Sequence, residues 1–528
     1  MPSSSYWKAG LVALVVALVW VLFMDMSIVG SSAPNQTVLP RNITSANAIQ
    51  ISSTTVALAS GELPGYTGWA RPERTLAGFF TVQSLSTHQP TVGSDFSIRL
   101  WCHRNEDCTK GNSMFYLRAY GPSVIPGILK TEGRGKYVAT FNFQDPGVYT
   151  LEVVLTYSTP PTIESFPLPA EYPEPAYEGY LIPGFPMQVS VQEASSAEER
   201  KRVNLDEETS ICKAEHLLET SPTSAVAKAR WKVIGKSSAP NHYAKSKGIT
   251  KAGYLRNVNS LGVHMDYKYL SGCSLLPQAN FERRPGNKNP FSQCGDKNLH
   301  IVFVGDSVMR VQKAMFDSFV ENMPNIQTSY VTLYGGYRRV EALEPTFQVK
   351  LEDIQRRAVN DIKVVLFNSG LHDIHRLCGS EWKDDRYEYL NKDLLDAGAF
   401  SCIEEYKSLI HDLASKMVNF EADLRVFQST SAAWPKYGNF GIEWPFGGQM
   451  MPMATDIVPA FNEVAFDVLL KSFPDTIGMI DGYWITYSRP DNREIGPIGN
   501  KLSHPGEEVQ SAMSRIWAVL ILDKFCNF

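Results

Sequence analysis

Several patterns that assign a function directly are missing from this sequence of 528 residues. It has no Cys-x-x-Cys pair, which argues against a zinc ribbon or a thioredoxin-like redox site. No basic run stands out and the formal net charge is -5, so nucleic acid is not an expected partner. No internal repeat is visible, and only residues 9–24 form an apolar run close to the length of a membrane span. The chain is too long for one compact core, so we expect two or more domains.

The apolar run at residues 9–24 predicts where the chain is located. Lys8 precedes it and Asp25 follows it, so positive charge lies only on its N-terminal side. We interpret residues 1–24 as a short cytoplasmic tail and a transmembrane signal-anchor, with the bulk of the chain luminal. The alternative is a signal peptide cleaved near residues 30–33. We therefore expect a single-pass protein of a secretory-pathway membrane, in the first place the Golgi, with a secreted or cell-surface protein as the alternative.

Residues 25–72 are polar and aperiodic, which favours a stalk. The glycosylation sequons at Asn35 and Asn42 fall within it, in agreement with a luminal topology. The eight cysteines of the chain are an even number, which predicts disulfides in a luminal protein. Neighbours in the sequence are the pairs that we expect: Cys102 with Cys108, Cys273 with Cys294, and Cys378 with Cys402.

Several stretches of residues 73–195 alternate apolar and polar side chains with a period of two, and a Pro-rich connection at residues 159–186 precedes the last of them. Strands are expected at residues 96–100, 137–143, 148–155 and 188–191, with turn signals between them. Short strands with no helical stretch between them predict an Ig-like β-sandwich. Residues 196–295 show no clear pattern, and we assign them as a linker or entry segment without a fold.

From residue 296 to residue 528, strand-like apolar runs alternate with amphipathic helical patterns. Strands are expected at residues 299–304, 363–367, 424–427 and 477–480. Helices are expected at residues 308–319, 403–417, 457–469 and 509–520. This alternation predicts an α/β domain with a mostly parallel sheet and helices on both faces.

Ser307 is the first candidate for chemistry, because it follows a buried strand and precedes a helix. In an open α/β sheet, ligands bind at the carboxyl ends of the strands, and a helix start offers backbone N–H groups to a developing oxyanion. Gly305 permits the tight turn that such a serine needs. The alternative is a serine that only caps the helix.

His504 is the second candidate, because it lies just before the last helix, where Pro505 suits the first helical position and Glu507 and Glu508 suit the first turn. The dipole of a helix N-terminus disfavours the imidazolium cation, and a neutral imidazole is what a general base needs. A surface histidine near a helix start is the alternative.

The segment from Asn368 to Asp373 directly follows the second strand, so a loop there would converge on the same sheet edge as Ser307. Asn368 or His372 is a candidate oxyanion donor, and an Asx-type turn is the alternative. His372 and His375 resemble metal ligands, but no third ligand stands out, so we expect no metal. Gly335-Gly336, after a short apolar run at residues 330–334, offers either a further oxyanion amide or an ordinary turn.

Taken together, these motifs resemble the PC-esterase branch of the SGNH/GDSL hydrolases. The matching residues are Gly305, Asp306, Ser307, Asn368, Gly370, His372, Asp373 and His504. The β-sandwich ahead of them resembles the neurexophilin-and-PC-esterase architecture, and the resemblance covers roughly residues 75–528. It implies an SGNH-like, flavodoxin-like α/β domain over residues 296–528.

The resemblance also implies roles for these residues. Ser307 would be the nucleophile and His504 the base. The implied oxyanion donors are the amide of Ser307, an amide of Gly335 or Gly336, and a side chain of Asn368 or His372.

One position departs from the family pattern. The family usually carries Asp three residues before its histidine, and this chain has Lys501. A triad aspartate orients the imidazole and stabilises its cation. Asp491, Glu494, Asp481 or a backbone carbonyl is left to do so for His504.

The expected function is a luminal acyl esterase or O-acetyltransferase that acts on glycans through a serine acyl-enzyme. Its partner is an acylated glycan or glycoprotein, it is held at the membrane by its N-terminal helix, and no cofactor is expected. The alternative is a catalytically inactive glycan- or protein-binding membrane protein of the same fold.

Overall fold

The computed structural model divides the chain into two compact units, Met1–Gln50 and Ile51–Phe528, and every residue described below belongs to the second. The described residues are 76–86, 88–103, 106–109, 111–158, 160, 178, 180–194, 210–219, 229–236, 265–281, 288–333, 346–369, 371–378, 397–432, 454–489, 492–496, 499–526 and 528. Within them, no helix combines the length and apolar character needed to cross a membrane. The predicted anchor at residues 9–24 and both sequons lie outside the described residues.

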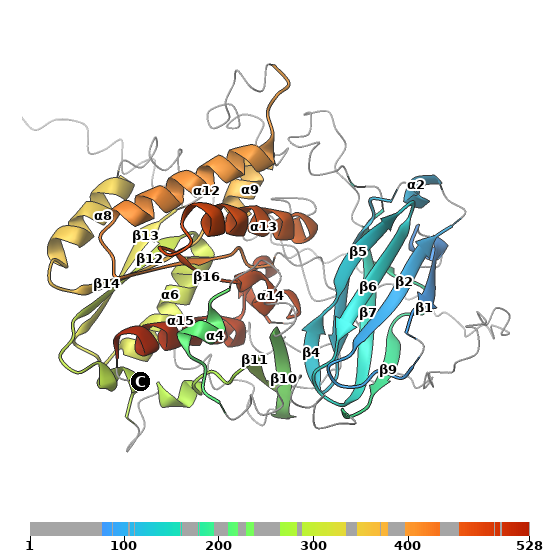
Figure 1. The fold of residues 1–528 in the computed structure, drawn as a ribbon, viewed down its shortest axis with the longest axis horizontal. Coiled ribbons are helices and arrows are strands. Elements are labelled where there is room, and N and C mark those ends of the chain that lie inside the picture. The colour runs from blue at the N-terminus through green and yellow to red at the C-terminus, as the bar shows by residue number, and fades with distance from the viewer. Residues whose placement is uncertain are drawn as a thin grey trace, which may run out of the picture. The chain divides into compact units, whose positions relative to one another are not determined.

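The first part of the second unit consists of two antiparallel sheets (Figure 1). One sheet has the order β1 (Phe80–Ser84), β2 (Asp95–Cys102), β6 (Lys136–Asn142), β5 (Ile128–Gly133). The other has the order β11 (Met265–Ser271), β10 (Ala229–Lys236), β4 (Ser123–Pro126), β3 (Met114–Tyr120), β7 (Gly147–Tyr157), β8 (Tyr180–Leu181), with β9 (Met187–Val191) also paired to β7. The short helices η1 (Leu76–Phe79) and α2 (Glu106–Thr109) accompany them.

The period-two pattern explains these strands. Along β2, Phe96, Ile98 and Leu100 are buried and the residues between them are not. Such a strand has one face for a core and one for water. The four strands predicted at residues 96–100, 137–143, 148–155 and 188–191 are confirmed as β2, β6, β7 and β9.

The segment at residues 196–295, for which the sequence predicts no fold, contributes two strands to the seven-stranded sheet. β10 pairs with β4, where Trp231 lies opposite Val124, and β11 pairs with β10. The segment also holds the short helices α4 (Ala214–Leu217), η4 (Gln278–Asn280) and η5 (Pro290–Cys294). The segment is therefore part of the seven-stranded antiparallel sheet through strand pairing.

A five-stranded parallel sheet forms the last part of the chain. Its order is β13 (Ile326–Thr332), β12 (Leu299–Gly305), β14 (Ile362–Phe367), β15 (Leu424–Gln428), β16 (Gly478–Ile480). β12 is the first strand of this sheet along the chain yet lies between the second and the third, β13 and β14, so the strand order reverses there. The architecture is mixed α/β, with antiparallel sheets and a parallel sheet.

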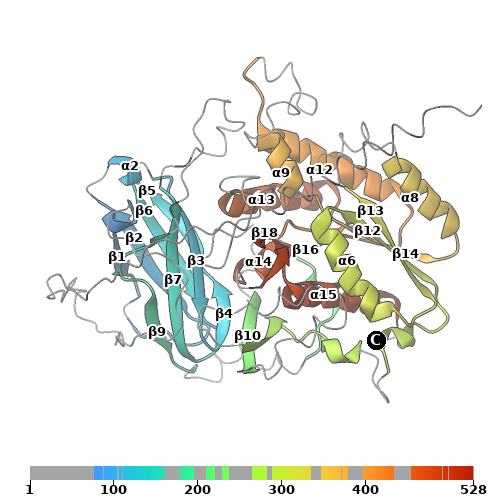
Figure 2. The same ribbon diagram turned by 180° about the vertical axis from the view of Figure 1, so that it is seen from behind.

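Helices cover both faces of the parallel sheet (Figures 1 and 2). They are α6 (Ser307–Val320), α8 (Thr346–Arg357), α9 (Leu371–Cys378), α12 (Cys402–Asn419), α13 (Ala454–Ser472), α14 (Gly482–Tyr487) and α15 (Glu507–Phe525). A two-stranded hairpin of β17 (Arg493–Gly496) and β18 (Gly499–Pro505) precedes α15. The four predicted strands and four predicted helices of residues 296–528 are confirmed as β12, β14, β15 and β16 and as α6, α12, α13 and α15.

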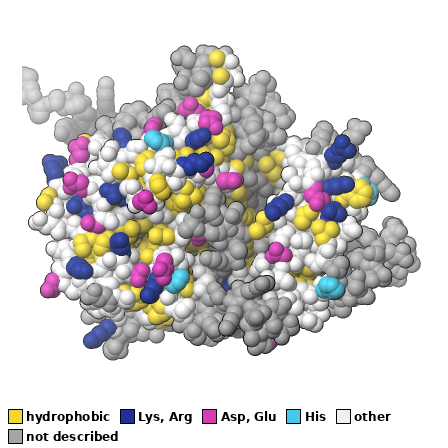
Figure 3. Space-filling view, viewed as in Figure 1, with side chains coloured by type: hydrophobic (Ala, Val, Ile, Leu, Met, Phe, Trp, Pro, Cys, Tyr) yellow, Lys and Arg dark blue, Asp and Glu magenta, His cyan; other side chains and the backbone are white. Residues whose placement is uncertain are grey.

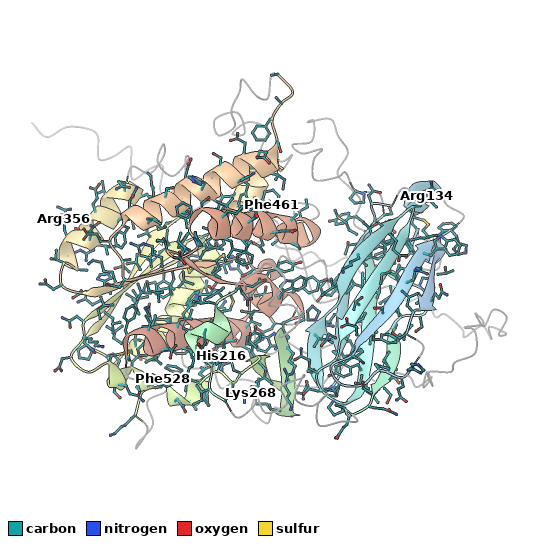
Figure 4. All side chains as sticks on the ribbon, viewed as in Figure 1. Arg134, His216, Lys268, Arg356, Phe461 and Phe528 are labelled. Carbon is teal, nitrogen blue, oxygen red and sulfur yellow. A yellow bond between two sulfur atoms is a disulfide. The ribbon has the colours of Figure 1, made fainter. Side chains whose placement is uncertain are left out.

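Side chains of β12 show how the sheet is filled. Ile301 and Phe303 belong to the hydrophobic cluster that includes α6 and α15, whereas Val302 and Val304 belong to the cluster that includes α12 and α13. On the second face, Phe461 of α13, labelled in Figure 4, packs edge-on against Tyr406 with 4.7 Å between the ring centroids. Both faces of every central strand are thus covered, as an apolar run without alternation requires.

Three disulfides join described residues: Cys102–Cys108, Cys212–Cys273 and Cys294–Cys526. The first was predicted, and the predicted pairing of Cys273 with Cys294 is wrong. Cys212 lies beside the turn after β11, where its amide donates to the Ser274 carbonyl at 3.0 Å. Cys402 is also disulfide-bonded, and its pairing with Cys378 stays a prediction because that side chain lies outside the described residues. These disulfides indicate an extracellular or luminal protein.

Candidate functional site

Ser307 is the first residue of α6 and directly follows the turn that ends β12. The helix is capped by Asp306, whose carboxylate accepts a hydrogen bond from the Val308 amide at 2.9 Å. The capping role considered for Ser307 is therefore filled by its neighbour. The Ser307 hydroxyl remains available for another partner at the carboxyl end of the sheet.

Two hydrogen bonds and one close contact hold the turn before Ser307. The carbonyl of Gly305 accepts hydrogen bonds from the Tyr330 hydroxyl at 2.8 Å and from the Leu333 amide at 2.7 Å. A Cβ atom on Gly305 would lie 2.8 Å from Cβ of Met309, which is closer than carbon atoms approach. Glycine is thus required by the close contact between the strand end and the first turn of α6.

The structure brings Ser307 and His504 together. Ser307 Oγ lies 2.8 Å from His504 Nε2, although the two residues are 197 positions apart in the sequence. His504 is only 8% exposed and belongs to β18, which lies against α6 (Figure 2). A hydroxyl and an imidazole nitrogen at this distance form a hydrogen bond along which a proton can be transferred.

The hairpin that carries His504 differs from the sequence prediction. Pro505 is the last residue of β18 and not the first of the helix, because Gly506 is the N-cap of α15. Glu507 and Glu508 do occupy the first helical turn, as predicted. His504 is therefore positioned by a β-hairpin that ends at the helix, rather than by the helix itself.

Asn368 lies beside the turn of Ser307, at the end of the neighbouring strand. Its amide donates to the Val304 carbonyl at 2.9 Å, and its side chain donates to the Gln428 carbonyl at 2.8 Å. The side-chain nitrogen carries two hydrogens, so one N–H remains beyond this bond. Strands β12 and β14 meet where the strand order reverses, which is where open α/β sheets bind ligands.

The expected loop from Asn368 to Asp373 is shorter than predicted, because α9 begins at Leu371. The prediction of a loop is wrong for His372 and Asp373, which lie in the first turn of α9. Asp373 is buried and accepts a hydrogen bond from the Ser369 hydroxyl, so it fixes this helix start. His372 is partly exposed at the same helix start.

Asp481, one of the acids considered as a partner of His504, has another role in the described structure. It is the N-cap of α14 and accepts hydrogen bonds from the Ser429 hydroxyl at 3.0 Å and from the Tyr483 amide at 2.9 Å. Burial, followed by the nearby charge of Glu219, raises the pKa of Asp481 to about 7. Asp481 thus stabilises the helix that follows β16.

Other predicted residues lie outside the described part of the chain, namely Gly335, Gly336, Gly370, Asp491 and the side chains of His375, Glu494 and Lys501. Within the described part, no group of three or more His, Cys, Asp or Glu residues is arranged to hold a metal ion. Acidic and basic side chains are interspersed over the face shown in Figure 3.

Sequence reasoning missed Arg489 and Asn492, and it missed that Glu508 pairs with Arg489. Arg489 is almost fully buried and its guanidinium lies 2.7 Å from the Glu508 carboxylate. No local pattern marks them, because their partners come from separate elements.

Comparison with known proteins gives little information. No protein-family model matches the chain, and no curated protein matches it. Among solved structures, the chain is similar to the filamin domain of Lin-41, with 14% sequence identity and a TM-score of 0.16 over 24% of this chain and 98% of that one.

Proposed function

We propose that this protein is a secretory-pathway acyl esterase or O-acetyltransferase that acts on glycans through a serine acyl-enzyme. The observation that carries the proposal is the 2.8 Å contact between Ser307 Oγ and His504 Nε2 at the carboxyl end of the parallel sheet. The proposal includes an Ig-like assignment for the antiparallel sheets and an SGNH-like, flavodoxin-like assignment for residues 296–528. It also includes a Golgi membrane location through an anchor at residues 1–24.

In the proposed reaction, neutral His504 accepts the hydroxyl proton of Ser307 as Ser307 Oγ attacks the ester carbon. The tetrahedral intermediate collapses, and His504 returns the proton to the departing sugar oxygen. Water or a second sugar hydroxyl then attacks the acyl-enzyme, with His504 again accepting the proton. The acyl group leaves as a free acid or as a new ester, and Ser307 regains its proton.

Charge on the attacked carbonyl oxygen needs donors fixed before the reaction. The amide of Ser307 lies in the first turn of α6, where backbone N–H groups are not used within the helix. The remaining side-chain N–H of Asn368 is the second candidate. Both come from the ends of adjacent strands, β12 and β14, so a carbonyl oxygen between them would lie beside Ser307 Oγ.

Acyl release from an acetylated glycan tests this proposal. We expect Ser307→Ala and His504→Ala to lower the rate by about 10⁴-fold or more, because members of a nucleophile–base pair act as a unit. Ser318→Ala is the matched control on the same helix, since the Ser318 hydroxyl donates to the Met315 carbonyl inside α6. Equal activity of wild type and Ser307→Ala refutes the nucleophile assignment.

One observation favours the second candidate function, a non-catalytic glycan- or protein-binding protein. Lys501 stands where the resembled family carries the acid of its triad. A protein of this kind binds an acylated glycan equally well as wild type and as Ser307→Ala, and releases no acyl group in either form.

A further inference from the structure

An ion pair between a buried arginine and a partly buried glutamate lies beside the hairpin that carries His504. Arg489 is 1% exposed, and its Nη2 atom lies 2.7 Å from Glu508 Oε2. Glu508 is the second residue of α15, four positions after His504. A guanidinium so deeply buried needs a countercharge, and the Glu508 carboxylate supplies it through this 2.7 Å contact.

Asn492 connects this pair to the strand of His504. Its side chain donates to Glu508 Oε2 at 3.4 Å, and its carbonyl accepts a hydrogen bond from the Gly506 amide at 2.7 Å. A Cβ atom on Gly506 would lie only 2.5 Å from Oδ1 of Asn492, so the two segments are in close contact. The next pair along the hairpin is Arg493 with Pro505, the residue that follows His504.

On its other side, Arg489 contacts the antiparallel part of the unit. Its guanidinium carbon lies 4.8 Å from the ring centroid of Trp231, a cation–π contact. Trp231 is 1% exposed, and its indole N–H donates to the Ile485 carbonyl of α14 at 2.9 Å. Trp231 belongs to β10, which lies beside α14 in both Figure 1 and Figure 2.

A second contact fixes the same helix. The hydroxyl of Tyr116 on β3 donates to the Tyr487 carbonyl at 2.9 Å, and the Tyr487 hydroxyl accepts from the Leu117 amide at 3.0 Å. Tyr487 is the last residue of α14, two positions before Arg489. The position of Arg489 is therefore determined by the seven-stranded sheet as well as by α15.

We propose that Arg489 is a positioning residue for His504: paired with Glu508 and held by Trp231, it fixes the hairpin that keeps the imidazole against Ser307. The inference rests on the proposed function and extends it, because it makes the antiparallel sheet a support of the catalytic base. A displacement of a reacting group by about 1 Å costs about 100-fold in rate. Loss of the guanidinium fork thus slows the chemical step without removing any group that touches the substrate.

The test compares Arg489→Lys and Trp231→Phe with wild type in the full chain, using p-nitrophenyl acetate as substrate. Lysine keeps the positive charge and loses the planar fork, and phenylalanine keeps a ring and loses the indole N–H. We expect Arg489→Lys to lower kcat by about 10- to 100-fold with KM within about twofold, and Trp231→Phe to lower it less. Faster hydrogen exchange of the Gly506 amide is the second readout, and it requires no catalysis.

Arg425→Lys is the matched control. Arg425 lies at the start of β15, the opposite end of the parallel sheet, and its guanidinium donates to the carbonyls of Met417 and Phe420 at 2.8 and 2.7 Å. The variant Arg425→Lys also loses a planar guanidinium, but at a position that does not contact the hairpin. Wild-type kcat in Arg489→Lys, or the same loss of kcat in Arg425→Lys, overturns the inference.

The exchange readout separates this inference from the proposed function. If Ser307→Ala hydrolyses the ester as fast as wild type, the proposed nucleophile is wrong. The hydrogen-exchange rate of the Gly506 amide then becomes the only test of whether Arg489 anchors the hairpin. Faster exchange in Arg489→Lys than in Arg425→Lys then retains the anchoring of the hairpin. Unchanged exchange refutes it.

Discussion

The carboxyl group of Asp481 is predicted to make the stability of the protein fall as pH rises. Asp481 is 4% exposed, and burial, with the charge of Glu219 as the second cause, raises its pKa to about 7. Hydrogen bonds from Ser429 and from the amides of Tyr483 and Trp484 act in the opposite direction and are outweighed. The group is therefore protonated in the folded protein at mildly acidic pH and is costly to ionise above pH 7.

The magnitude follows from the difference between the folded and unfolded states. The pKa rises by about three units from its usual value near 3.8, and each unit corresponds to about 1.4 kcal/mol. Because the pKa is raised on folding, the protonated form favours the folded state. That stabilisation is complete below about pH 4 and is lost as pH rises through 7, amounting to about 4 kcal/mol at the alkaline end.

Asp481→Asn tests this reasoning because asparagine keeps an oxygen that accepts the same hydrogen bonds and cannot ionise. We expect the variant to equal wild type near pH 4 and to be more stable by up to about 4 kcal/mol at pH 8.5. Urea unfolding followed by tryptophan fluorescence from pH 4 to 8.5 measures the difference. Asp467→Asn, which removes an exposed carboxylate on α13, is the control.

A variant that is less stable than wild type at pH 8.5 contradicts the prediction. It would mean that the ionised carboxylate is stabilised by its three donors more than it is penalised by burial. The same pH dependence in Asp481→Asn and wild type contradicts it equally.

Two further substitutions test the close contacts around the site. Gly506→Ala places a Cβ atom 2.5 Å from Asn492 Oδ1, so we expect a loss of about 1–3 kcal/mol in stability and slower labelling of Ser307 by a fluorophosphonate. Gly305→Ala places one 2.8 Å from Met309 Cβ, and we expect a similar loss of stability, with labelling slowed because the turn of Ser307 moves. Unchanged melting temperature and labelling in either variant refutes the packing argument for that glycine.

The parallel sheet could be predicted from the sequence because its strands need no partner information. Residues 301–304 and 364–367 are apolar without alternation, which only strands buried on both faces tolerate. The helices between them show a clear apolar face. The order of the strands in the sheet could not be predicted. It depends on the side of β12 on which each later strand is placed, and no local sequence pattern records that side.

The two disulfides between distant cysteines and the hairpin could not be predicted for the same physical reason. Cys294 and Cys526 are 232 residues apart, and their pairing follows from the packing of η5 against the end of α15. The strands of the hairpin, residues 493–496 and 499–505, contain no period-two apolar run in the sequence. Local sequence patterns predict the individual helices and strands. The contact between Ser307 and His504 depends on how elements that are distant in the sequence pack together.

Lys501 replaces an acid that has two physical roles in the resembled family. A triad acid orients the imidazole, and it stabilises the imidazolium that forms during the reaction. The backbone of His504 is already fixed by the hairpin, through the 2.7 Å bond between Gly506 and Asn492 and through the ion pair of Glu508. The position of the His504 backbone therefore has a source that does not depend on the residue three positions before the histidine. What an acid at position 501 would add is orientation of the ring and stabilisation of its cation, so its absence bears on the rate of the proposed reaction more than on the presence of the Ser307–His504 contact.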